Sequence, residues 1–383
     1  MARKPWASES VTEGHSDKLA DLISDTVLDF CLKQDQMSRV ACETFLPGDR
    51  KQQVIIGGEI TTKADYEELF MEVRKTIESI GYTMDVSPEF NNKTCRINWL
   101  VKTQSPDISQ GVDTGGSGDQ GFMIGYASNE TQELMPIPIY LAHKLTKRLT
   151  EARKEGTLKF LRPDGKSQVS VVYENGKPVE VSHITIAAQH SEDVSDKDLQ
   201  EGILDQVVKL SIPEYLIKGN LFDITTINGT GRFVVGGPVG DSGLTGRKIV
   251  VDSYGGTAPN GGGCYSGKDA TKVDRSAAYM ARYIAKNIVA AGLAERCQIH
   301  LAYEIGKAEP TAINVETFGT SNISDESLEQ MVRKEFPLTP KEIIGHLDLR
   351  KPIFAKTTNY GHFGREGFTW EKTDKAEELK KYL

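Results

Sequence analysis

A β-hairpin pattern followed by a helical pattern occurs three times in this chain, and this repetition most constrains how the chain can fold. The pattern starts near Arg39, Gln168 and Cys297, at intervals of roughly 130 residues, although the three segments share little residue identity. In the second copy, the sequence ENGK at residues 174–177 separates two alternating runs, which is a strong signal for a type I′ turn. The repetition predicts an α+β fold of three similar units, each a sheet with helices on one face.

Length and charge limit the class of protein. The chain has 383 residues, a formal net charge of −8 and five cysteines. This length exceeds one ordinary hydrophobic core, so two or three domains are expected. The acidic balance disfavours nucleic acid or an anionic membrane as a partner, and no run approaches transmembrane length. An odd number of cysteines without metal-ligand spacing indicates reduced thiols in a cytoplasmic protein and no zinc site.

The stretch Gly255–Ala277 combines glycines with lysines and reads GGTAPNGGGCYSGKDATKVDRSA. Its glycines allow positive φ angles and a close approach of the backbone to a ligand. Lys268 and Lys272 precede a helical pattern that starts at Asp274 and has Gly292 as a plausible C′ residue. Because a helix N-terminus favours an anion, a polyphosphate is the natural ligand. A solvated surface loop is the alternative.

The same stretch nearly matches a P-loop. Residues 262–268 fit G-x-x-x-x-G-K, but Asp269 stands where Ser or Thr should hold Mg²⁺. The apolar run Ile249–Val251, which would be its strand, ends well before the glycines. A phosphotransferase or NTPase of another class is therefore a second hypothesis, and a non-enzymatic nucleotide-binding protein is a third.

Cations beside glycines recur along the chain, at Lys166, Arg232, Arg247, Lys248, Lys268 and Lys272. In an acidic chain they favour one polyphosphate site, where Arg makes bidentate phosphate contacts and Lys supplies a point charge. Carboxylates would then hold Mg²⁺ or a larger monovalent ion, and the candidates are Asp17, Glu43, Asp241 and Asp274.

The residues alone leave the roles of three carboxylates and a histidine open. Ser16 is a fair N-cap, which places His15 and Asp17 at the start of a helix. Asp17 could merely complement the helix dipole, and His15 could be an incidental surface residue. Glu43 and Glu59 interrupt the apolar strands of the first hairpin; if buried, each needs an ion pair, a hydrogen bond or a metal.

Ten short segments in one order carry a resemblance to a known family: ESVTEGHSDK, RVACET, GGEITT, QSPDI-x-QGVD, GDQG, MP-x-P, LRPDGKSQV, GRFVVGGPVGDSGLTGRKIVVDSYGG, SGKDATKVDRSAAY and YGHFGRE. From about Trp6 to Lys375 the chain resembles the S-adenosylmethionine synthetases, or methionine adenosyltransferases. The resemblance implies three domains in a pseudo-threefold arrangement, at residues 3–102, 117–232 and 234–375. It also implies a homodimer or a dimer of dimers, with active sites shared between two subunits.

The implied reaction converts ATP, L-methionine and water to S-adenosylmethionine, diphosphate and phosphate. The methionine sulfur attacks C5′ of ATP, the whole triphosphate leaves, and the enzyme then cleaves it. A thioether is nucleophilic without a base, which agrees with the absence of a Ser/His/Asp or Cys/His pattern. The barrier then lies in positioning and in the charge on the leaving group, which clustered cations can stabilise.

The resemblance also assigns roles to residues that match the family's motifs. It implies catalytic roles for His15, Asp119, Lys166, Arg247 and Lys268. It implies contacts with ATP or L-methionine for His15, Glu59, Gln104, Asp164, Gly165, Lys166, Arg232, Phe233, Asp241, Arg247, Lys248, Cys264, Lys268 and Lys272. It implies two Mg²⁺ ions per site, held by Asp17 and Asp274, and one K⁺ per subunit, held by Glu43.

The chain departs from the family's pattern in four places. Ser16 replaces a Pro, Gly229 replaces another Pro, and Cys264-Tyr265 replaces Ala-Phe. Residues 102–121 are rich in glycine and lack periodicity, so they are either a domain connection or an active-site lid. Within it, only residues 114–117 stand between the motifs QGVD and GDQG, so the part that corresponds to the family's gating loop is shorter than usual here.

Overall fold

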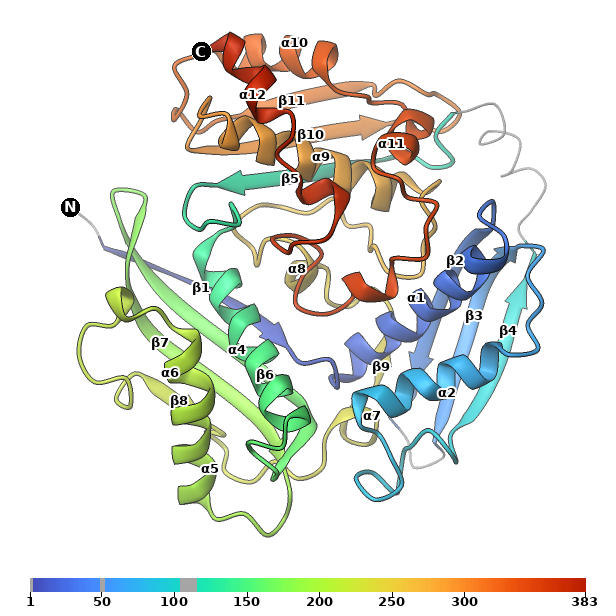
Figure 1. Cartoon of the computed structure of the whole chain (residues 1–383), viewed down its shortest axis with the longest axis vertical. Helices are drawn as coiled ribbons and strands as arrows, with labels where there is room; N and C mark the ends of the chain where they lie inside the picture. Colours follow the sequence, from blue (N-terminus) through green and yellow to red (C-terminus); the bar gives the residue numbers. More distant parts are fainter. Residues whose placement is uncertain (1–2, 49–51, 104–115) are drawn as a thin grey trace.

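The computed structural model describes residues 3–48, 52–103 and 116–383. Its three β-sheets are arranged around the middle of the molecule (Figure 1). One long helix packs on each sheet: α1 (Ser16–Gln34), α4 (Ile137–Lys154) and α9 (Val273–Ala290). The α+β class and the division into three sheet-plus-helix units, both predicted from the sequence, are confirmed.

The first sheet is built on the hairpin of β2 (Arg39–Leu46) and β3 (Gln53–Thr61), which pair antiparallel. The strand β4 (Arg96–Lys102) runs parallel to β3. In the sequence, β3 and β4 are connected through α2 (Leu69–Ile80), which packs beside α1. Alternate residues of β2, such as Val40 and Cys42, are buried in the core, whereas their neighbours face outward, as expected for strands covered on one face.

The second sheet contains the predicted type I′ hairpin. The strands β6 (Leu161–Glu174) and β7 (Lys177–His190) are antiparallel, and Asn175 and Gly176 between them have φ angles of 55° and 77°. Positive φ at both central positions defines this turn, so the prediction is confirmed. After it come α5 (Asp196–Ile203), a π-helical turn over 204–208, the short α6 (Lys209–Ser211), and β8 (Thr225–Ile227), which runs parallel to β7.

The third sheet contains the hairpin of β10 (Arg296–Tyr303) and β11 (Ala312–Glu316), followed by α10 (Asp325–Glu335). The remaining chain forms α11 (Pro340–His346), irregular turns and α12 (Ala376–Leu379). The side chain of Trp370 in this tail is fully buried and stacks on Tyr279 of α9, with 3.9 Å between the ring centroids. The tail therefore belongs to the core of the third unit.

Each unit gives its leading strand to another unit. The strand β1 (Lys4–Val11) precedes α1 but pairs with β6. The strand β5 (Gly121–Ser128) precedes α4 but pairs with β10, and β9 (Gly243–Leu244) precedes α9 but pairs with β2. The three units are therefore linked in a closed cycle, and each sheet takes one strand from a neighbouring sequence range. The domain ranges 3–102, 117–232 and 234–375 remain a proposal.

Strand order repeats in the same way. In each sheet the donated strand lies beside the first hairpin strand: the orders are β9-β2-β3-β4, β1-β6-β7-β8 and β5-β10-β11. The buried apolar residues form two clusters, one shared by the first and third units and one beneath the second sheet. No helix in the described part of the chain is long and apolar enough to cross a membrane.

Two local predictions need correction. His15, not Ser16, is the N-cap of α1, because the His15 ring accepts the hydrogen bond from the backbone amide of Asp17. Residues Ile249–Asp252 form the short helix α8 instead of a strand. Gly292 follows α9 with a φ angle of 79°, as predicted for a C′ glycine.

Candidate active site

His15 ends the loop after β1 and caps α1. Its Nδ1 atom accepts a hydrogen bond from the backbone amide of Asp17, at 3.1 Å. Burial, with the positive charges of Lys248 and Lys166, lowers the pKa of His15 to about 3. The imidazole is therefore neutral at pH 7, and because Nδ1 accepts, the proton is on Nε2. This tautomer can donate one hydrogen bond to a ligand.

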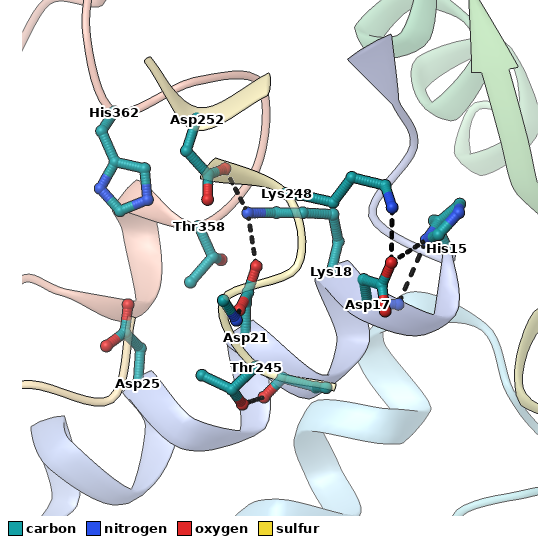
Figure 2. A network of polar contacts seen from close by, with 12 residues as sticks. His15, Asp17, Lys18, Asp21, Asp25, Thr245, Lys248, Asp252, Thr358 and His362 are labelled. Carbon is teal, nitrogen blue, oxygen red and sulfur yellow. Dashed lines mark hydrogen bonds and ion pairs between the residues drawn. The ribbon is translucent and has the colours of Figure 1, made fainter. Parts of the chain in front are cut away.

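Asp17 lies beside His15 and is almost fully buried (Figure 2). Its carboxylate accepts the backbone amide of Leu244 at 3.0 Å, pairs with the Lys248 ammonium, and lies 3.5 Å from Nε of Arg247. Burial opposes ionisation of this carboxyl, but the hydrogen bonds from Lys248 and Leu244 outweigh it and lower its pKa. Asp17 is therefore ionised in a setting rich in positive charge.

Strand β6 adds a second cation near His15. Lys166 is exposed on this strand, opposite Val11 of β1, and Gly165 pairs with Ala188 of β7. Asp164 is buried: its Oδ2 atom accepts the amide of Gly237 at 2.8 Å, and burial raises the pKa of its carboxyl. The Oδ1 atom of Asp164 has no hydrogen-bond partner among the described residues, so it can accept one from a ligand.

Arg232, Phe233 and Asp241 lie between β8 and β9, in a segment that contains the short helix α7 (Gly237–Gly240). Arg232 is exposed and pairs with Glu192, while the amide of Phe233 donates to Nε2 of His190 at 3.0 Å. Asp241 is exposed and accepts the amide of Ser242 at 2.8 Å. Arg232 and Asp241 therefore lie on the surface, whereas Phe233 is partly buried.

A second group of predicted residues is centred on Lys268. Its ammonium pairs with Asp274, in the first turn of α9. Burial acts to lower the pKa of Lys268, but nearby negative groups, among them Asp274 and Asp119, outweigh it and raise the pKa. Lys272 pairs with the buried Asp269 at 2.5 Å. The two lysines of the glycine-rich stretch are thus each held by a carboxylate.

The glycines of this stretch approach protein groups closely. A Cβ atom at Gly263 would lie 2.3 Å from Oδ1 of Asp274, and one at Gly261 would lie 1.8 Å from the carbonyl oxygen of Phe122. No side chain fits at either position. The expectation that glycine allows close approach is therefore correct, but at these two positions the neighbour is the protein itself.

Glu43 and Glu59 lie on the outer face of the first sheet. Glu43 is exposed and Glu59 is partly exposed, so neither is a buried carboxylate that needs a partner. Glu59 pairs with Lys102 at 3.2 Å. Ala41 of β2 is the register partner of Glu59 on one side and of Lys268 on the other. Because such partners share a sheet face, Glu59 and Lys268 face the same way, about two strand spacings apart. Gln104 lies outside the described residues.

The two groups meet at Gly246 and Cys264. A Cβ atom at Gly246 would lie 2.8 Å from Cβ of Cys264, so the two loops are in contact. Cys264 is partly buried, and burial raises the pKa of its thiol, which is therefore protonated. The structure thus brings the loop of Arg247 and Lys248 against the loop of Lys268.

The described residues include no group of three or more His, Cys, Asp or Glu side chains arranged to hold a metal ion. The predicted metal ligands Asp17 and Asp274 are each paired with a lysine instead. Single carboxylates beside phosphate-binding cations do fit Mg²⁺, which typically takes one or two carboxylates together with substrate phosphates. The donor set is therefore compatible with metals that arrive with the substrate.

Sequence reasoning missed several buried charges behind these loops. Asp21 and Asp25 of α1 accept backbone amides of the two loops, and Asp269 accepts the amide of Val40. The signal was present in the chain, because acidic residues at 17, 21, 25 and 29 repeat at one helical turn. The predicted site residues thus form clusters of paired charges in an α+β protein, with cations from more than one unit.

Comparison with known proteins identifies the family. Residues 3–106, 114–233 and 235–372 match the N-terminal, central and C-terminal domains of S-adenosylmethionine synthetase. The S-adenosylmethionine synthase of Desulforudis audaxviator (strain MP104C) is 52% identical to this chain over an alignment 396 residues long. The alignment covers 99% of this chain and 98% of that protein. The chain belongs to the S-adenosylmethionine synthetase family. It is an enzyme, a methionine adenosyltransferase, as the motifs indicated.

Proposed function

We propose that this chain joins ATP and L-methionine by attack of the methionine sulfur on C5′, and that it then hydrolyses the displaced triphosphate to diphosphate and phosphate. The cluster of Lys166, Arg247 and Lys248 around His15 and Asp17 supports this reaction best. Three cations and one neutral hydrogen-bond donor suit the negative charge of a chain of phosphates.

His15 would donate its Nε2 proton in a hydrogen bond to the oxygen that leaves C5′. A neutral donor is suited to this task, because it stabilises charge that develops in the transition state without binding the ground state as strongly as a cation would. The sulfur needs no deprotonation, so no side chain has to act as a base in the first step. Arg247, Lys248 and Lys166 would neutralise the departing triphosphate.

On the other side of the site, Lys268 would contact the same phosphates, and Asp119 would lie near the reacting centre. Glu59 is partly exposed and could hold the ammonium group of methionine, with Gln104 and Lys272 as further contacts. Asp164, Arg232, Phe233 and Asp241 would bind the nucleotide. Of these, Asp164 has the clearest structural support, because it is buried with one unpartnered carboxylate oxygen.

The metal ions proposed for this site are Mg²⁺ at Asp17 and Asp274, and K⁺ at Glu43. When bound, they would add positive charge beside the phosphate oxygens. The lysines that now pair with Asp17 and Asp274 would turn toward the phosphates. Glu43 is exposed, so further oxygen ligands would have to complete the K⁺ site around it.

The outer face of the first sheet supports self-association. Phe45 is 39% exposed and Leu100 is 67% exposed, and both lie on the same face as Glu43 and Glu59. An apolar sheet face beside functional carboxylates is typical of an interface. We propose a homodimer or a dimer of dimers whose sites are completed across this face. All five cysteines are free, which fits a reducing, cytoplasmic location.

The direct test incubates the protein with ATP, methionine, Mg²⁺ and K⁺ and separates the products by liquid chromatography. The expected result is one sulfonium product with diphosphate and phosphate in equal amounts. Formation of ADP without a sulfonium product would instead support a phosphotransferase. Omission of each metal in turn, with the remaining components unchanged, tests the two metal assignments separately.

A further inference from the structure

Helix α1 has four aspartates at successive turns, and each one accepts backbone amides from a distant segment. All four side chains are buried: Asp17, Asp21, Asp25 and Asp29. Asp17 accepts the amide of Leu244, and Asp29 accepts the amides of residues 354 and 355. Part of this row is seen along α1 in Figure 2. One helix therefore anchors three separate segments of the chain.

Asp21 anchors the loop of Arg247 and Lys248. Its Oδ1 atom accepts the amide of Gly246 at 2.8 Å, one residue before Arg247. Its Oδ2 atom accepts a hydrogen bond from Lys18 at 2.9 Å, and Lys18 also donates to Asp252 at 2.6 Å (Figure 2). Gly246 has a φ angle of 84°, a conformation that a glycine adopts readily. The carboxylate thus holds the loop at its turn.

Asp25 holds the loop of Lys268 in two ways, directly through a backbone amide and indirectly through Arg275. Its Oδ1 atom accepts the amide of Gly267 at 2.8 Å. Both carboxylate oxygens also pair with Arg275, at 2.7 and 2.9 Å, and Arg275 donates to the carbonyl oxygen of Lys268 at 3.1 Å. A Cβ atom at Gly267 would lie 1.9 Å from the carbonyl oxygen of Cys42, so the backbone is also closely packed there.

We propose that Asp21 and Asp25 are positioning residues: Asp21 holds the Arg247–Lys248 loop and Asp25 holds the Lys268 loop against helix α1. Asp21 and Asp25 are four residues apart, or about 6 Å along the helix. The inference rests on the proposed function, in which each of the two loops contacts triphosphate. Neither aspartate touches the substrate.

Stability alone does not account for these buried charges. A buried ion pair is weak evidence for stability, because desolvation offsets most of the attraction. Asp29 provides the internal comparison: it lies on the same helix, is also buried and accepts two amides, but the segment that it holds contains no predicted site residue. If the four aspartates served folding only, replacing Asp21 and replacing Asp29 would have the same effect on kcat.

The test compares Asp21→Ala, Asp21→Asn and the control Asp29→Ala. Asp21→Ala removes the acceptor for Gly246 and is expected to lower kcat about 10²-fold, as expected for a misplacement of roughly 1 Å, with KM for methionine within about twofold. Asp21→Asn keeps an acceptor oxygen and should recover part of kcat. Asp29→Ala should leave kcat within about twofold. Equal losses of kcat in Asp21→Ala and Asp29→Ala would overturn the proposal.

Hydrogen exchange of backbone amides gives a readout that does not depend on turnover. Asp21→Ala should speed exchange in residues 244–248 and leave residues 354–355 unchanged, and Asp29→Ala should do the reverse. Unchanged exchange at 244–248 in Asp21→Ala would refute the anchoring role. If Asp21→Ala does not fold, Asp21→Asn against Asp29→Asn decides. A wild-type protein without synthetase activity would refute the proposed function alone.

Discussion

The Nδ1 atom of His15 accepts a hydrogen bond from the backbone amide of Asp17, with 3.1 Å between the two nitrogens. One ring nitrogen therefore caps helix α1, and the other is left to donate to a ligand. This division separates the structural role of the residue from its proposed chemical role. A single substitution that keeps the cap and removes the second nitrogen can therefore separate the two roles.

We expect His15→Ser to keep the helix and lose the reaction. Serine is a good N-cap, so the midpoint of thermal unfolding should fall by no more than a few degrees. The lost Nε2 donor should lower kcat by about 10²–10³. Steady-state kinetics and calorimetry on the same preparation check both parts. A variant with wild-type kcat would show that His15 is only a cap.

We expect Lys268→Ala to impair the chemical step more than methionine binding. The substitution removes a cation near the leaving group and leaves Asp274 without its partner, which adds uncompensated negative charge. The loss in kcat should be about 10²–10³, with a much smaller change in KM for methionine. Lys307→Ala, which removes a surface lysine paired with Glu304, is the matched control and should behave as wild type. Near wild-type kcat in Lys268→Ala would argue against the assignment.

Mixed subunits test whether the active sites are shared. Lys166 lies on the second sheet near His15, whereas Lys268 lies with the outer face of the first sheet. If each active site combines the Lys166 group of one subunit with the Lys268 group of a second subunit, inactive Lys166→Ala and Lys268→Ala proteins should regain about a quarter of wild-type activity when mixed equally. Half of the dimers would then be hybrids, each with one unaltered site.

The control for this experiment is a pair from one face. Glu59 and Lys268 are both aligned with Ala41, so they should belong to the same half of a shared site. A mixture of Glu59→Ala and Lys268→Ala should therefore remain inactive. Subunit exchange must be verified by mass spectrometry. Absence of rescue in both mixtures would count against sites shared between these two groups.

Buried histidines should make the fold sensitive to acid. Burial lowers the pKa of His143 from 6.5 to about 3, so between these values the unfolded chain binds a proton that the folded protein does not. The contribution of His143 to stability therefore falls as the pH falls below about 6.5, by about 1.4 kcal/mol per pH unit. His143→Asn should remove this dependence.

The measurement is denaturant unfolding of both proteins from pH 7 to pH 4.5. Buried carboxyl groups with raised pKa values act in the opposite direction; the pKa of Asp29 is about 6 and that of Asp252 is about 7, and burial is the main cause of both. They are common to both proteins, so the difference in slope isolates the histidine. Equal slopes would show that His143 is protonated in the folded state.

Local patterns in the chain were enough to predict the elements and the class of fold. The hairpin turn at Asn175 and Gly176 is specified by two residues that tolerate positive φ, and the stop at Gly292 by one. The order of the ten motifs was enough to identify the family. These signals depend on residues that are close in the sequence, so they can be read without a tertiary structure.

Tertiary structure alone decided how the units and the charges combine. The exchange of β1, β5 and β9 pairs strands that lie far apart in the chain, and no local periodicity specifies such partners. The neutral state of His15 depends on burial and on Lys166 and Lys248, which come from other segments. The sequence by itself supplied the aspartates of α1 at one-turn spacing, but only folding turned them into acceptors for distant loops, because a buried carboxylate takes its role from the donors packed around it.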